Sequence, residues 1–248
     1  MARHARLCLA GQAHLVLQRA NSVVFADAAD YQDYLSRLAQ TAQRHAVQVH
    51  GYALLPQAVW LVLTPADCAG MSALLQTLAR CASRRRGQGA GLWQGRFRSA
   101  LLQQRPWLLA ALCAVDLAPQ LDGASTDATG WPWSSLAHHT GRQPCAWLRE
   151  AQPYWELGNT PYAREAAYAQ LLAGDLAMQH WSELSRAVRG STALGDAVYL
   201  QWAEQQLGRS LRPRARGRPS VARPPSYMSP IDLDQAATGP ENGDTIVK

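Results

Sequence analysis

Residues 47–65 read VQVHGYALLPQAVWLVLTP and contain two apolar runs of strand length on either side of Pro56 and Gln57. Valine, leucine and aromatic residues in short runs favour extended backbone, so we predict strands at Val47–Leu54 and Val59–Thr64. Two further runs have the same character, Ala13–Gln18 and the region near Arg96–Leu102.

Helical periodicity fills the segments between these strands. Within Asp30–Arg44, apolar and aromatic residues recur at helical spacing after a possible cap at Asp27 or Asp30. Met71–Arg84 and Pro106–Leu117 are the next two predicted helices. The resulting order, β-α-β-β-α-β and then a helix, predicts an α+β fold: a ferredoxin-like antiparallel sheet with two helices on one face and the other face left available.

Changes in composition divide the chain into three predicted parts. Residues 1–123 form the α+β domain, and residues 124–207 form a C-terminal helical extension. Residues 208–248 are rich in proline and arginine and then polar and acidic, so we expect a disordered tail. Six arginines between Gly208 and Pro225 account for the whole net charge of +6, which suits an arm that binds a polyanion.

The cysteines and the apolar runs indicate where in the cell the protein is expected. The longest apolar run, Trp107–Val115, is too short to cross a bilayer, and no signal-peptide pattern begins the sequence. We therefore expect a cytoplasmic protein that makes no membrane contact. The cysteines are odd in number and widely spaced, which predicts reduced and mostly buried thiols; they are Cys8, Cys68, Cys81, Cys113 and Cys145.

Several motifs together resemble the REP-associated tyrosine transposases, a group of single-tyrosine HUH transposases. Tyr52–Pro65 is similar, without a gap, to the family segment Tyr-x-Leu-Met-Pro-Asn-His-Val-His-Leu-Leu-Leu-Thr-Pro. Arg19 and Asn21 match an Arg-x-Asn signature, Leu92–Arg98 resembles Phe-Gln-Gly-Arg-Phe-Lys, and Trp131–Ser135 reproduces Trp-Pro-Trp-Ser-Ser. The resemblance spans about residues 1 to 220.

The resemblance implies a catalytic site whose chemical groups this chain lacks. In the family, a His-x-His pair on a strand holds a divalent metal such as Mg²⁺, and a tyrosine on a following helix attacks the scissile phosphate. The histidine positions correspond to Ala58 and Trp60, and the tyrosine position corresponds to Ala114. We therefore expect a degenerate, pseudoenzyme-like member with no metal cofactor. Other candidate groups, such as Asp116 and the His138-His139 pair, are interpreted as structural.

Basic residues interleaved with aromatics predict contacts with single-stranded or hairpin DNA. A helix end followed by core aromatics would give the same pattern between Arg84 and Arg98, but the resemblance favours DNA. Arg216–Pro219 is similar to an AT-hook core, and a basic tail that binds any polyanion remains equally open. The predicted DNA-binding residues are Arg19, Asn21, Arg84, Arg85, Arg86, Trp93, Gln94, Arg96, Arg98, Arg216 and Arg218.

The sequence thus predicts a transposase-family protein that binds single-stranded, hairpin or repeat DNA without cutting it. One alternative is an active transposase, or single-strand nickase, with a rearranged site. A second alternative is a protein-interaction module that holds a partner in the vacated pocket around Val59, Trp60 and Ala114. The family includes monomers and dimers, so a homodimer also remains open.

Overall fold

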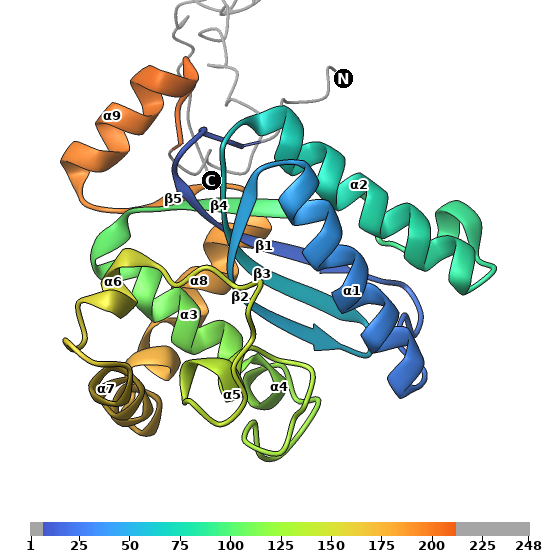
Figure 1. Ribbon diagram of the computed structural model, residues 1–248. Helices are drawn as coiled ribbons and strands as arrows, with labels where there is room; N and C mark the ends of the chain where they lie inside the picture. The colour runs from blue at the N-terminus through green and yellow to red at the C-terminus, as the bar shows by residue number, and fades with distance from the viewer. Residues whose placement is uncertain (1–6, 212–248) are drawn as a thin grey trace, which may run out of the picture. The chain divides into compact units, whose positions relative to one another are not determined.

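The computed structural model describes residues 7–211, and these form a mixed α+β fold, as predicted. The first elements follow the predicted order of strands and helices (Figure 1). The main elements are β1 (Ala13–Arg19), α1 (Ala28–Arg44), β2 (Val47–Leu55), β3 (Ala58–Pro65), α2 (Cys68–Arg85), β4 (Arg98–Leu102), α3 (Leu109–Asp116), α7 (Pro161–Ala173), α8 (Leu176–Gly190), β5 (Ala193–Leu194) and α9 (Ala197–Leu207). Shorter turns of helix are η1 (Gly89–Gly91), η2 (Gln104–Leu108), α4 (Ala118–Leu121), α5 (Leu136–His139) and α6 (Gln152–Trp155).

Within residues 7–211 the strands make a five-stranded sheet in the order β2-β3-β1-β4-β5. The pairs β2–β3, β1–β3 and β1–β4 are antiparallel, and β5 joins β4 in parallel. Leu17 lies opposite Trp60, and Arg19 lies opposite Ala58. This register places alternate residues of β1 and β3 on the same face of the sheet.

One face of the sheet packs against α1 and α2, as predicted (Figure 1). Asp27 begins α1, because its carboxylate accepts a hydrogen bond from the Asp30 backbone N–H at 2.9 Å. Tyr34, Leu38, Leu74 and Leu78 from the two helices join the apolar side chains of this face in one buried cluster.

The opposite face is also covered, which corrects the prediction that it is available. Helices α3 and α8 contact this face, and Leu112 and Val188 belong to the same buried cluster as Leu17 and Trp60. Strands buried on both faces have nearly continuous apolar sequences, and Ala58–Pro65 is such a sequence. The sheet face that was expected to be available is therefore part of the core.

The Trp-Pro-Trp-Ser-Ser segment protects the outer edge of the sheet at β2. The Leu54 N–H donates to the Trp133 carbonyl, and the Ser135 N–H donates to the Tyr52 carbonyl, both at 2.9 Å. The Trp131 indole N–H donates to the Leu54 carbonyl at 3.0 Å. These bonds satisfy backbone groups that an open edge would expose to other chains.

Cys8 and Cys68 form a disulfide, which contradicts the expectation that all thiols are reduced. The two Cα atoms are 5.8 Å apart although 60 residues separate the cysteines in sequence. Sequence spacing could not reveal this pair, because tertiary folding brings the N-terminal segment to the start of α2. Among residues 7–211, Cys81, Cys113 and Cys145 are free.

Candidate nucleic-acid interface

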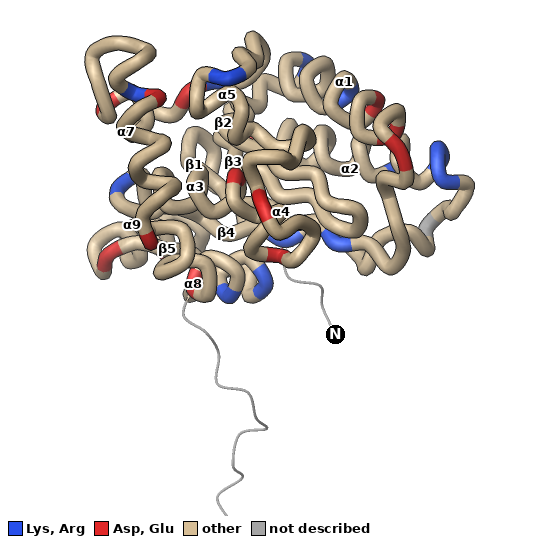
Figure 2. Tube along the Cα trace, turned by 90° about the horizontal axis from the view of Figure 1, so that it is seen from below, with Lys and Arg blue, Asp and Glu red and all other residues tan. Residues whose placement is uncertain are grey.

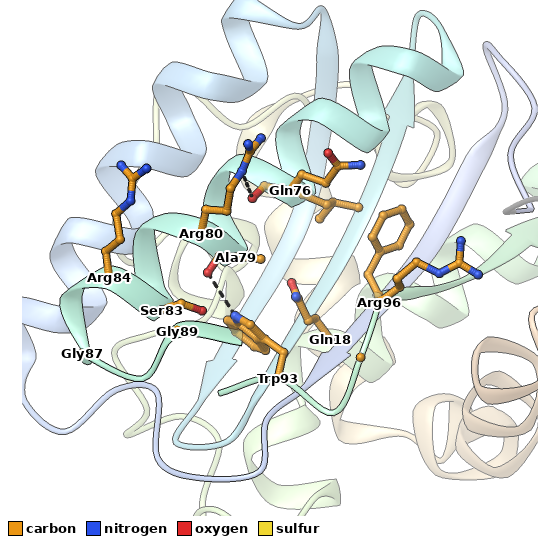
Figure 3. A pocket seen from close by; sticks show the side chains of 13 residues that line it. Gln18, Gln76, Ala79, Arg80, Ser83, Arg84, Gly87, Gly89, Trp93 and Arg96 are labelled. Atoms are coloured by element: carbon orange, nitrogen blue, oxygen red, sulfur yellow. Dashed lines mark hydrogen bonds between the residues drawn. The ribbon is translucent and has the colours of Figure 1, made fainter. Parts of the chain in front are cut away.

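A groove of about 670 Å³ lies between the outer side of α2 and the loop that leads from α2 to β4 (Figure 3). Its side chains come from β1, α2 and the glycine-rich loop. They are Gln18, Leu75, Gln76, Ala79, Arg80, Ser83, Arg84, Trp93, Arg96 and Phe97, with Gly87, Gly89 and Gly95 in the wall.

Helix α2 presents a polar stripe to this groove. Gln76, Arg80 and Arg84 follow one another at intervals of four residues, so they share one face of the helix, and all three are exposed. The Arg80 Nε–H donates to the Gln76 backbone carbonyl at 3.3 Å. Leu74 and Leu78 occupy the buried face and anchor α2 on the sheet.

Glycines let the loop turn sharply at the end of the groove. Gly87 and Gly95 have φ angles of +63° and +129°, conformations that residues with side chains rarely adopt. The loop places Trp93 against α2, where its indole N–H donates to the Ala79 carbonyl at 3.1 Å. Trp93 is 8% exposed, so it forms a fixed apolar wall with only a small free surface.

The charge of the groove has one sign. Arg80, Arg84 and Arg96 lie at its exposed rim, and no aspartate or glutamate lines it within residues 7–211. Elsewhere on the described residues, basic and acidic positions are interspersed, and a run of adjacent arginines ends α2 (Figure 2). The groove therefore combines a cationic rim with a buried, largely apolar floor.

Of the predicted DNA-binding residues, the structure brings Arg84, Trp93 and Arg96 together in this groove. Gln18, Gln76 and Arg80 also line it, and none of the three was predicted from the sequence. The four-residue spacing of Gln76, Arg80 and Arg84 could have predicted that these side chains share one face of a helix. No pattern in the sequence indicates Gln18, because its position in the groove depends on how β1 packs against α2 and the following loop.

Arg85 and Arg86 point instead toward the start of α1, where both form ion pairs with Asp30. Burial on its own would raise the pKa of Asp30. The hydrogen bonds from Arg85 and the Ala26 N–H, together with the charges of both arginines, outweigh burial and lower that pKa. Both guanidinium groups therefore already serve to join α2 to α1, and their contact with DNA stays a prediction.

Four other predicted DNA-binding residues contact the protein itself. The Arg19 guanidinium pairs with Asp122 at 2.8 Å, and Arg98 donates to the Arg189 carbonyl at the end of α8. The Asn21 amide donates to the Gly91 carbonyl at 2.9 Å, and the Gln94 amide donates to the Ala20 carbonyl at 3.1 Å. Arg216 and Arg218 lie outside the described residues.

The three residues that the sequence resemblance aligns with the family's catalytic groups lie in one buried cluster. Ala58 is 3% exposed, Trp60 is 0% exposed and Ala114 is 1% exposed, and all three belong to the cluster between the sheet, α3 and α8. The Trp60 ring packs on Trp181 of α8 with a centroid separation of 5.0 Å. Alanine offers no metal-binding atom, and an indole does not serve as a metal ligand, so these residues do not fit a divalent cation.

The vacated pocket of the interaction-module alternative is therefore filled. Large side chains from α8 occupy the space beside Trp60, and Val59 belongs to the core cluster on the opposite face of the sheet. No partner can enter at these positions without unpacking α8. The predicted location of this pocket was wrong, because an alternating strand directs Val59 and Trp60 to different faces of the sheet.

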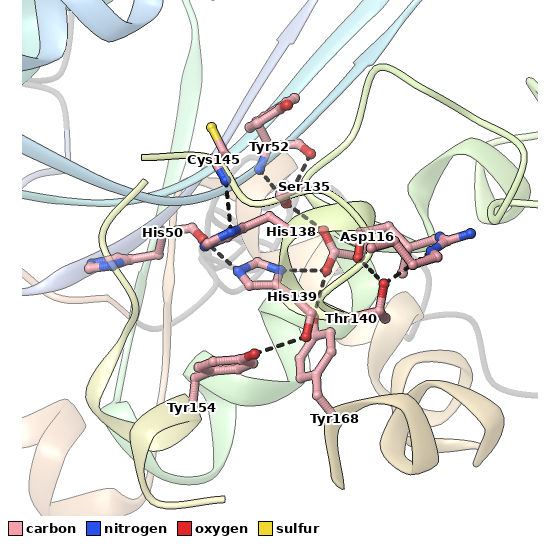
Figure 4. A network of polar contacts seen from close by, with 12 residues as sticks. His50, Tyr52, Asp116, Ser135, His138, His139, Thr140, Cys145, Tyr154 and Tyr168 are labelled. Carbon is pink, nitrogen blue, oxygen red and sulfur yellow. Dashed lines mark hydrogen bonds and ion pairs between the residues drawn. The ribbon is translucent and has the colours of Figure 1, made fainter. Parts of the chain in front are cut away.

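A buried polar network joins α3 to the segment after Trp131 (Figure 4). The Asp116 carboxylate accepts hydrogen bonds from the Ser135 hydroxyl, from the Tyr168 hydroxyl at 2.8 Å and from the His139 Nδ1 at 2.6 Å. The His139 Nε2 lies 3.0 Å from the His50 carbonyl. Each of these side chains is at most 1% exposed, so the network fits a structural role better than a catalytic one.

Residues 7–211 contain neither a metal-binding cluster nor a membrane-spanning helix. No group of three or more His, Cys, Asp and Glu side chains in this part of the chain is arranged to hold a metal ion. No helix there has the length and apolar character needed to span a membrane.

The fold is similar to that of a REP-associated tyrosine transposase solved in complex with a REP hairpin. The TM-score is 0.50 at 13% sequence identity, and the match covers 61% of this chain and 93% of that chain. A protein from Deinococcus radiodurans R1, assigned as a transposase, matches with a TM-score of 0.31 and 16% identity over 40% of this chain and 84% of its own. No protein-family model and no curated protein matches the chain. The resemblance to transposases is thus confirmed at the level of the fold.

Proposed function

We propose that this chain is a transposase-type DNA-binding protein that recognises single-stranded, hairpin or repeat DNA through the groove beside α2 and does not cut it. The observation that carries the proposal is the rim of Arg80, Arg84 and Arg96 around an acid-free groove. The shared fold with a hairpin-bound transposase supports DNA as the polyanion.

The arrangement of the groove suits a flexible single strand. Guanidinium groups neutralise phosphates and form forked hydrogen bonds with them. The buried floor, which includes Leu75 and Phe97, offers apolar contact to bases. An unpaired strand or a hairpin loop can present phosphates and bases at once, whereas a duplex keeps its bases stacked inside.

We propose that the chain does not cleave DNA because the residues at the positions aligned with the family's catalytic groups lack the necessary chemical groups. Ala58, Trp60 and Ala114 supply neither metal ligand nor nucleophile, and all three are buried. Tyr154 and Tyr168, which lie in the same buried cluster, are at most 3% exposed. A scissile phosphate could not reach these hydroxyls in the folded protein.

The test measures hairpin and single-stranded DNA binding by the full chain over a salt series. Replacing Arg80, Arg84 and Arg96 together with alanine is expected to weaken binding and to lower the slope of log affinity against log salt by about 2. The matched control replaces three exposed arginines outside the groove, Arg44, Arg149 and Arg189, and removes the same charge. A variant with alanine at Arg216 and Arg218 measures the contribution of the tail.

Several outcomes would contradict the proposal. Equal losses in the groove variant and in the control would mean that only net charge matters. Tighter binding to an RNA hairpin of the same sequence would point to another nucleic acid. Nicked DNA in the presence of magnesium or manganese would favour the alternative, an active transposase with a rearranged site.

A further inference from the structure

Gln18 reaches the floor of the groove from β1. Figure 3 shows its side chain projecting from the strand into the space between Trp93 and Arg96. It is 5% exposed, and its neighbours on the floor include the buried Leu75 and Phe97. An amide thus lies beside apolar side chains at the bottom of the groove.

The Gln18 amide lacks a hydrogen-bond partner that its burial would normally require. The Oε1 atom is buried, and no atom within residues 7–211 donates to it. Buried polar side-chain atoms are bonded in most folded proteins, so such an atom needs an explanation. Among the buried, unpartnered polar atoms of the described residues, this one alone belongs to a side chain that lines the groove.

A hydrophobic residue would serve the floor better if packing were its sole task. Leu or Met would fill a similar volume beside Leu75 without leaving a polar atom unbonded. The position faces a cationic rim that can hold a phosphate backbone. A ligand that brings a hydrogen-bonding edge to the floor and phosphates to the rim would satisfy both features.

We propose that the groove holds one unpaired DNA base and that Gln18 hydrogen bonds with the edge of that base. This inference rests on the proposed function and names its specificity-determining residue. The terminal torsion of glutamine is broad, so the amide can turn either its oxygen or its NH₂ group toward the base. Each base presents donors and acceptors on its edge, and an unpaired base has its pairing edge free.

The experiment compares two single strands of equal length, one bearing bases and one abasic, by fluorescence anisotropy with the full chain. The wild type is expected to bind the base-bearing strand about tenfold more tightly. Gln18→Met should weaken binding of that strand by about tenfold and leave the abasic strand unchanged. The matched control, Gln48→Met, changes an exposed glutamine of β2 and should alter neither affinity.

The outcomes separate this inference from the proposed function. If Gln18→Met leaves both affinities unchanged while the triple arginine variant weakens binding, the base-reading role is overturned and the proposed function stands. If neither variant weakens binding, both proposals fail. The melting temperature of Gln18→Met should equal or exceed that of the wild type, because the unbonded amide is gone. Gln18→Leu is the second apolar variant, and equal losses on both strands would also overturn the base-reading role.

Discussion

Asp116 is a fully buried carboxylate that joins three parts of the chain. It accepts hydrogen bonds from Ser135, His139 and Tyr168. We expect Asp116→Ala to lower the free energy of unfolding by about 3 to 5 kcal/mol, because removing one member of a buried hydrogen-bonded network leaves three other buried groups without that partner. Urea denaturation measures this change.

A carboxylate on the surface provides the comparison. Asp33 pairs with Arg37 one helical turn away on α1, and the pair is partly exposed. Asp33→Ala should change the free energy of unfolding by about 0.5 kcal/mol or less. Similar losses in the Asp116 and Asp33 variants would show that the network contributes no more than a surface pair.

His14 makes the stability of the fold depend on pH. Burial lowers its pKa to about 4, although the hydrogen bond to the Gln12 carbonyl acts in the opposite direction. Its other ring nitrogen accepts from the Leu9 N–H at 3.2 Å, so this imidazole is neutral in the folded protein.

The direction of the pH effect follows from the lowered pKa. The contribution of His14 is fully present above pH 6.5, where the unfolded chain is neutral as well, and it is lost as the pH falls toward about 4. The loss is of order 3 kcal/mol at most. Between pH 6.5 and about 4, the free energy of unfolding of His14→Gln should depend less steeply on pH. The difference in slope corresponds to the uptake of up to one proton fewer on unfolding. Identical slopes for the two proteins would contradict this.

At the scale of the elements, the sequence predicted the strands and the first two helices because their patterns are local. Tyr31, Tyr34 and Leu38 repeat within one helix, and residues 47–65 carry two apolar runs. The cover on the second sheet face was missed because α8 reaches Trp60 from more than 100 residues away in the sequence. Local periodicity contains no signal for such a contact.

Helix α8 should therefore contribute strongly to the sheet core. Trp181→Ala removes the ring that packs on Trp60, and we expect a loss of about 3 kcal/mol in the free energy of unfolding. Trp202 of α9 is 37% exposed and packs on Tyr199, so Trp202→Ala should cost about 1 kcal/mol or less. A smaller loss for Trp181→Ala than for Trp202→Ala, measured by urea denaturation, would contradict this role of α8.

At the scale of the whole molecule, the groove was predicted in part. The basic and aromatic run from Arg84 to Arg98 pointed to its region, but folding separated that run: Arg84 and Arg96 face the groove, while Arg85 pairs with Asp30 and Arg98 bonds with Arg189. The sequence alone does not distinguish these four arginines from one another. Only the direction of each side chain from its helix or strand determines which of them can meet a ligand.

The Cys8–Cys68 disulfide acts at this same scale, because it ties the segment before β1 to the start of α2 and closes a loop with a sequence separation of 60. Restricting the unfolded chain in this way is expected to stabilise the fold by about 4 kcal/mol.

Adding a reductant should therefore lower the melting temperature of the wild type. A variant with alanine at both Cys8 and Cys68 should melt at the lower temperature with or without reductant, whereas Cys145→Ala should respond as the wild type does. If the melting temperature of the wild type did not change with reductant, the bond would not constrain the unfolded chain. Other contacts, such as the packing of Leu7 against Leu101 and Ala203 and the hydrogen bond from Ser99 to the Leu7 carbonyl, would then hold the N-terminal segment.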